Sequence, residues 1–188
     1  IRKEISHNEY IKKILNLKKL PDLISTTLKC EAKIQLMAKD IYESKGVIFL
    51  GRGPSFPIAL EGALKLKELS YINAEGYPAG EMKHGPLALI EEGLPVVILA
   101  PKDRYFEKTI SNMQEVIARG GKVLLITNEE NNIISENIRF KLEVPKVDNH
   151  LTSFLTTIPL QFLAYHIASL KNLDIDKPRN LAKSVTVE

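Results

Sequence analysis

Apolar and charged residues alternate at helical spacing over the first part of the chain. Between Asn8 and Lys19 the apolar positions Ile11, Ile14 and Leu15 are interleaved with lysines, a pattern that predicts a short amphipathic helix. Pro21 suits the first turn of a second helix, whose apolar periodicity continues until Gly46, a residue favoured just past a helix end. The first 46 residues therefore predict two helices.

Continuous apolar runs follow, each four to six residues long and bounded by glycine, proline or polar residues. Such runs are typical of strands buried on both faces of a sheet. The predicted strands in these runs are 47–50, 95–100 and 123–127. The segment 140–144, where apolar residues alternate with Lys141 and Glu143, is predicted as one more strand, and the predicted helices include 106–118 and 151–170. Alternation of this kind predicts an α/β fold with a doubly wound parallel sheet covered by helices on both faces. One domain accounts for the chain, with 1–20 as a linker helix and 21–188 as the domain proper.

Composition excludes several classes of protein. The chain has 44% hydrophobic and 26% charged residues, and its apolar runs are too short to cross a bilayer. A net charge of +3 with dispersed lysines gives no support for nucleic-acid binding. Cys30 is the single cysteine, so an internal disulfide and a cysteine-based metal cluster are ruled out, and the four histidines lack metal-ligand spacing. We expect Cys30 to be a small buried helix residue, and a reducing, cytoplasmic location fits. The chain opens on Ile1 without a signal peptide or a starting methionine, which suggests truncation of a longer protein.

The first candidate motif is Gly51-Arg52-Gly53-Pro54-Ser55-Phe56, directly after a predicted strand. Glycines between a strand and a helix can present backbone amides to a phosphate. However, Pro54 and Pro57 remove two of those amides, and Phe56 stands where a dinucleotide fingerprint needs glycine. A tight strand-to-helix turn is the better interpretation.

Three charged residues share one face of the helix that follows. Glu61, Lys65 and Glu68 lie at positions i, i+4 and i+7, which places two carboxylates and one ammonium together. Such a face can hold a general base, but it is more often a solvated face with ion pairs. Gly62 interrupts the helix at a cost of about 1 kcal/mol, which indicates that something approaches the backbone closely there.

Two further groups have chemistry suited to catalysis. His84 lies between Gly80 and Pro86, so the imidazole belongs to a loop or a helix end, where a proton-transfer role competes with an ordinary surface position. Lys183 lies in a C-terminal tail with apolar neighbours such as Leu181 and Val185. Partial desolvation there would make its amine a nucleophile toward carbonyls, whereas a flexible end would leave it solvated.

Four segments resemble one family closely: Phe49-Leu-Gly-Arg-Gly53, Ala59-Leu-Glu-Gly-Ala-Leu-Lys-Leu-Lys-Glu68, Gly80-Glu-Met-Lys-His-Gly-Pro-Leu-Ala-Leu89 and Pro178-Arg-Asn-Leu-Ala-Lys-Ser-Val-Thr-Val-Glu188. They occur in order, at family-like spacing, in the isomerase half of glutamine:fructose-6-phosphate amidotransferase. That half contains two sugar-isomerase (SIS) domains, and 21–188 is similar to the second. The resemblance implies fructose 6-phosphate as substrate, glucosamine 6-phosphate as product, and no cofactor.

The resemblance also implies a role for each candidate residue. Lys183 would form a Schiff base with C2 of open-chain fructose 6-phosphate, and Glu68 would move the proton from C1 to C2. His84 would assist ring opening in the site of the neighbouring subunit, so a homodimer is implied. Glu61, Lys65 and Ala182 would bind substrate around these groups.

The chain departs from the family in two respects. The cysteine-dependent glutaminase domain is absent, and the segment after the strand 95–100, Pro101-Lys-Asp-Arg-Tyr105, does not match the Ser/Thr-rich phosphate loop of the first SIS domain. We therefore expect the isolated fragment to be feeble or inactive. Two alternatives stay open: a non-catalytic sugar-phosphate-binding module, and a related sugar-phosphate isomerase or deglycase that does not use glutamine.

Overall fold

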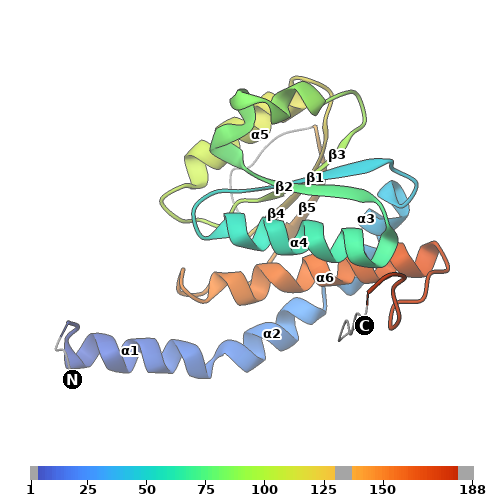
Figure 1. Cartoon of the computed structure of the whole chain (residues 1–188). Coiled ribbons are helices and arrows are strands. Elements are labelled where there is room, and N and C mark those ends of the chain that lie inside the picture. The colour runs from blue at the N-terminus through green and yellow to red at the C-terminus, as the bar shows by residue number, and fades with distance from the viewer. Residues whose placement is uncertain (1–3, 130–136, 182–188) are drawn as a thin grey trace, which may run out of the picture.

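A five-stranded parallel sheet forms the centre of the molecule (Figure 1). The computed structural model describes residues 4–129 and 137–181. Along the sheet the strands follow the order β2-β1-β3-β4-β5. Their bounds are β1 Gly46–Gly51, β2 Asn73–Pro78, β3 Pro95–Leu99, β4 Lys122–Thr127 and β5 Ile138–Glu143. The chain winds from β1 to one side and then, through β3, to the other, so the predicted doubly wound α/β fold is confirmed.

Helices cover both faces of this sheet (Figure 1). One face carries α3 (Glu31–Ile41), α4 (Ser55–Ser70) and α6 (Thr152–Leu170), and α4 packs along α6. The other face carries α5 (Phe106–Ile117) and a short 3-10 helix, η1 (Ala79–His84), which is followed by η2 (Pro86–Leu89). Strand side chains alternate between the two cores: Phe49 packs on the α4 side and Ile48 on the α5 side.

The N-terminal helices lie outside this three-layer body. In Figure 1 α1 (His7–Lys18) extends away from the sheet, and α2 (Leu20–Leu28) leads back to it and packs against α6. No residue of α1 is buried. The part of the chain that the structure describes contains no helix long and apolar enough to cross a membrane.

The second predicted helix is wrong in one respect, because it divides into α2 and α3 at Lys29 and Cys30. The hydroxyls of Ser25, Thr26 and Thr27 each donate to the carbonyl four residues earlier, at 2.8–3.0 Å. Side chains that bond back in this way compete with the backbone ladder and bend a helix. Three in succession, directly before the break, give a physical reason for it.

The sequence pattern did not predict β2, η1 or η2. Strand β2 is an edge strand, and of its residues only Ala74 is fully buried, so the apolar run that reveals a central strand is missing. The four predicted strands correspond to β1, β3, β4 and β5, and these strands and the predicted helices at 106–118 and 151–170 are confirmed within two residues at each end.

Candidate functional site

Helix α4 carries three of the predicted site residues. It begins at Ser55, directly after the turn that ends β1, and strong helix formers such as Ala63 and Leu66 line its buried face. A Cβ atom built on Gly62 would stand 2.8 Å from Leu160 Cδ1 of α6 and 3.1 Å from the Phe49 ring. The close approach predicted at Gly62 is therefore confirmed, and the group that approaches is a neighbouring helix.

Lys65 and Glu68 form a direct ion pair near the C-terminal end of α4. The Lys65 ammonium donates to Glu68 Oε2 at 2.6 Å, and both side chains are about 30% exposed. This hydrogen bond raises the pKa of Lys65 above its ordinary value of 10.5, although partial burial opposes the rise, and the charges of Glu68 and Glu61 add to it. Lys65 is therefore an ammonium at neutral pH, and it holds the Glu68 carboxylate in one orientation.

A residue that the sequence analysis did not select ends the same helix. Tyr71 is the C-cap of α4, with a φ of 59° in the left-handed region, and its backbone N–H donates to the carbonyl of Lys67. Its hydroxyl accepts the backbone N–H of Arg179 at 2.9 Å, and the Arg179 guanidinium lies over its ring, 4.0 Å from the centroid. The C-terminal segment is thus fastened one helical turn beyond Glu68. Tyr71 and Arg179 are 108 positions apart in the sequence, so no local sequence pattern could predict their contact.

The two predicted C-terminal site residues are not among those that the structure describes. Residues 182–188 lie outside the described part of the chain, and with them the predicted residues Ala182 and Lys183. Leu181 is the last described residue, and its N–H donates to the carbonyl of Pro178 at 3.4 Å.

His84 lies on a different part of the molecule from Glu68. It is the last residue of η1, which confirms the predicted helix end, and its side chain is 75% exposed. Its Nε2 atom is 3.8 Å from Glu81 Oε2. Helix η1 follows the end of β2 and packs on the α5 face, whereas Glu68 lies near the end of α4 on the other face, before β2 begins. The structure therefore does not bring His84 and Glu68 together within one chain.

The glycine-rich segment after β1 is a tight turn, as predicted. Gly51 ends β1, and Gly53 has a φ of 55°, a conformation that favours glycine. The N–H of Ser55 donates to Arg52 and the N–H of Phe56 to Gly53, so the turn uses these amides itself. This turn accordingly offers little of the amide cradle that a pyrophosphate site needs.

The remaining candidate groups show no reactive arrangement. Half-burial raises the pKa of the Cys30 thiol from 9.0 to about 11, so the thiol stays protonated at neutral pH. The expectation of a small buried helix residue is wrong, because Cys30 is only half-buried and lies at the break between α2 and α3. Among the described residues, no group of three or more His, Cys, Asp or Glu side chains is placed to hold a metal ion.

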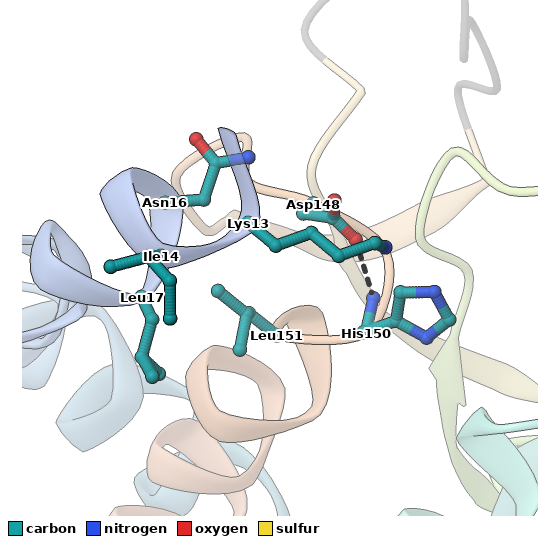
Figure 2. A pocket seen from close by; sticks show the side chains of 7 residues that line it. All are labelled: Lys13, Ile14, Asn16, Leu17, Asp148, His150 and Leu151. Carbon is teal, nitrogen blue, oxygen red and sulfur yellow. Dashed lines mark hydrogen bonds between the residues drawn. The ribbon is translucent and has the colours of Figure 1, made fainter. Parts of the chain in front are cut away.

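A separate hollow of about 270 Å³ opens between α1 and the segment before α6. Figure 2 shows Ile14, Leu17 and Leu151 facing one another there, with Asp148 accepting the backbone N–H of His150 at 3.2 Å. None of the predicted site residues that the structure describes lines this hollow. The hollow is therefore distinct from the charged face of α4.

Comparison with protein families places this architecture. The SIS domain family matches residues 40–171, a span that contains the whole sheet together with α4, η1, α5 and α6. The chain belongs to the SIS domain family. The match covers well over half of the chain, including Glu61, Lys65, Glu68 and His84.

Individual relatives of this SIS domain are more specific. The chain is 52% identical to "Glutamine--fructose-6-phosphate aminotransferase [isomerizing]" of Aquifex aeolicus, over 92% of this chain and 29% of that protein. It is also 52% identical to the protein of the same name from Bradyrhizobium diazoefficiens, over 100% of this chain and 31% of that protein. Among solved structures it is similar to the C-terminal domain of glucosamine-fructose-6-phosphate aminotransferase from Francisella tularensis, with a TM-score of 0.88 and 41% identity over 92% of this chain and 49% of that one. The chain thus spans under a third of the length of these curated relatives.

Proposed function

We propose that this SIS domain is the C-terminal isomerase part of a glutamine–fructose-6-phosphate aminotransferase, an enzyme that converts fructose 6-phosphate and glutamine into glucosamine 6-phosphate and glutamate. One observation carries the proposal. The end of α4 holds the Glu68 carboxylate on Lys65 at 2.6 Å, and the same helix end, through Tyr71, fastens the segment that leads to Lys183. A carboxylate and a lysine are the two groups that imine formation and proton transfer on a ketose require.

Lys183 supplies the nucleophile in this proposal. Its neutral amine attacks C2 of the open-chain sugar, water leaves, and an imine forms. Ammonia then adds to C2 and the lysine amine departs, which leaves an imine of ammonia on the sugar. Lys65 is the other lysine beside Glu68, and it is a poor candidate for this step because its hydrogen bond to Glu68 keeps it protonated.

Glu68 transfers the proton. It removes the proton from C1 and returns it at C2, which converts the ketose imine into the aldose amine. A single carboxylate can serve both carbons if its orientation is fixed, and the ammonium of Lys65 provides that constraint. Glu61, one turn before Lys65 on the same face, adds a second negative charge that binds substrate hydroxyls, and Ala182 contributes backbone contacts beside Lys183.

His84 assists ring opening from the neighbouring subunit of a homodimer. The support for this part is the placement of η1 and α4 on opposite faces of one sheet, which leaves His84 unable to join Glu68 of its own chain. The exposed imidazole of His84 can donate a proton to the ring oxygen of the closed sugar.

The remainder of the activity belongs to the preceding part of a longer, cytoplasmic polypeptide. A first SIS domain would hold the sugar phosphate, and a glutaminase domain would release ammonia. In this arrangement 1–20 is the linker helix and 21–188 is the second SIS domain. The support is the coverage: this chain corresponds to 29–31% of the curated relatives and to 49% of the solved Francisella domain.

Borohydride trapping tests the proposal. The parent-length protein is incubated with fructose 6-phosphate, reduced, digested and examined by mass spectrometry for a sugar adduct. We expect the adduct on Lys183 and its loss in Lys183→Ala. The matched control is Lys67→Ala, which removes an exposed lysine from α4 and should leave the adduct in place.

Two other outcomes have clear meanings. Protein that binds fructose 6-phosphate but gives no adduct at Lys183 would overturn the mechanism and favour a non-catalytic sugar-phosphate-binding module. An adduct at Lys183 without any incorporation of ammonia would indicate a related sugar-phosphate isomerase instead.

A further inference from the structure

We infer that Tyr71 is a positioning residue, which holds the C-terminal segment against the end of α4 so that Lys183 works beside Glu68. The inference rests on the proposed function, because it assigns a purpose to the place where the tail is fastened. Neither Tyr71 nor Arg179 touches the reacting atoms in this scheme. Their effect would be on how often the Lys183 amine meets the sugar.

The contact between Tyr71 and Arg179 has two separate parts. The Tyr71 hydroxyl accepts the Arg179 backbone N–H at 2.9 Å, and the Arg179 guanidinium lies 4.0 Å from the centre of the Tyr71 ring. The first part is directional, and the second adds a cation–π attraction over the face of the ring. Together they define both the position and the direction of the chain as it enters the last residues.

Tyr71 is itself held in place. It has a φ of 59° at the C-cap of α4, a position where glycine is the usual residue, and its N–H bonds to the carbonyl of Lys67. A left-handed tyrosine at a helix end directs its ring differently from a residue that continues the helix. The helix that carries Glu68 therefore also presents the ring and hydroxyl of Tyr71 to the tail.

The path of the tail between α6 and Tyr71 is also ordered by hydrogen bonds. Helix α6 ends at the same end of the helical layer as α4 (Figure 1), with Asn172 at a φ of 54° and the N–H of Leu173 bonded to the carbonyl of Ala168. The carboxylate of Asp174 then accepts the N–H groups of Asp176 and Lys177, both at 3.0 Å. These turns lead the chain from the end of α6 to the end of α4.

Chain length makes the position of this contact important. Lys183 lies four residues after Arg179, so covalent geometry limits the separation of their Cα atoms to about 14 Å. Glu68 precedes Tyr71 by one turn, about 5 Å along the helix axis. If the contact were lost, the last fastened residue before Lys183 would be Lys177, or Leu173 if the Asp174 turn also opened, and the tether would lengthen to as many as ten residues. Loop-closure statistics then predict that the amine reaches the same point up to about fourfold less often.

The experiment uses Tyr71→Phe in the parent-length protein, which removes the hydroxyl and keeps the ring, and Tyr71→Leu, which removes both parts of the contact. The rate of borohydride-trappable adduct formation on Lys183 is measured at saturating fructose 6-phosphate. We expect a decrease of about two- to fourfold, larger for Tyr71→Leu, with KM for fructose 6-phosphate unchanged. Hydrogen exchange at the Arg179 amide should become faster in both variants. Tyr42→Phe, which removes the hydroxyl of a half-buried tyrosine at the C-cap of α3, is the matched control.

A purely structural role for Tyr71 would lower the melting temperature and leave adduct formation per folded molecule unchanged, and that result would overturn the inference. Equal adduct rates in the wild type, Tyr71→Phe and Tyr71→Leu would overturn it as well. Failure of the proposed function looks different, because the wild-type protein itself would then form no adduct on Lys183. Slower adduct formation at an unchanged KM, with exchange faster only in the tail, supports the inference.

Discussion

Gly62 of α4 lies so close to Leu160 of α6 that a Cβ atom at position 62 would stand 2.8 Å from the Leu160 Cδ1 atom. Leu160 is 1% exposed, so it has little room to move, and the Phe49 ring closes the other side at 3.1 Å. The glycine therefore allows α4 and α6 to pack closely. It sets the position of the helix on which Glu68 is carried.

The first prediction concerns Gly62→Ala. Alanine gains about 1 kcal/mol of helix propensity, but overpacking against Leu160 costs about 1–3 kcal/mol, so we expect a net loss of about 1 kcal/mol in the free energy of unfolding. Urea denaturation of the chain measures it. In a Leu160→Ala background, where the space exists, the same substitution should become neutral or stabilising. An equal effect of Gly62→Ala in both backgrounds would contradict the close contact.

The second prediction concerns Glu68→Gln in the parent-length protein. The amide keeps the shape of the side chain but cannot accept a proton from C1, so kcat should fall by about 10²- to 10⁴-fold. The Lys183 adduct should still form, because imine formation does not require Glu68. Glu91→Gln changes an exposed glutamate outside α4; it is the matched control and should retain activity. A Glu68→Gln protein with near-normal kcat would remove Glu68 from the mechanism.

The third prediction tests whether a site is shared between subunits. Glu68→Gln and His84→Ala parent-length proteins are each expected to be nearly inactive. If Glu68 and His84 of one site come from different chains, a mixed dimer contains one site with both changes and one intact site. Random exchange of subunits should then restore about one quarter of the wild-type activity. No recovery in mixtures shown to contain mixed dimers would mean that each chain supplies both groups.

The fourth prediction concerns pH and Asp40, which connects α3 to two strands. Its carboxylate accepts a hydrogen bond from Arg139 at 2.7 Å and lies 3.3 Å from the Lys122 ammonium. The hydrogen bond from Arg139, followed by the contributions of Lys122, holds the pKa of Asp40 below its ordinary value of 3.8 despite partial desolvation. A group with a depressed pKa stabilises the folded state above its unfolded-state pKa, and this contribution disappears as the pH falls through the folded-state pKa.

Asp40→Asn should therefore melt a few degrees below the wild type near neutral pH, and the difference should shrink as the pH falls below about 3.8. Thermal unfolding followed by circular dichroism over a pH series measures this. Glu91→Gln removes one negative charge without removing an ion pair within the described part of the chain, and it controls for net charge. A difference that stays constant with pH would show that Asp40 acts through packing rather than charge.

Four of the five strands and most helices could be predicted because their signals are local. The run Val47–Leu50 is apolar throughout because both faces of the strand are covered. Such a run is recognisable in the sequence without any knowledge of the tertiary structure. Edge strand β2 lacks such a run, since Glu75 is exposed and the close approach of the Leu60 backbone leaves no room for a side chain at Gly76. The break between α2 and α3 was missed because consecutive hydroxyl side chains carry a weaker signal than a proline or glycine.

The sequence by itself determined that Glu61, Lys65 and Glu68 share one face, because the helix period follows from the backbone and needs no other part of the protein. Only the tertiary structure decided that Glu68 is paired with Lys65, that Gly62 is needed for packing against α6, and that Arg179 docks on Tyr71. It also decided that His84 and Glu68 belong to opposite faces of one sheet. The physical reason is the range of the interactions: helix periodicity depends on residues a few positions apart, whereas packing and docking join residues that folding brings together from as far as 108 positions away.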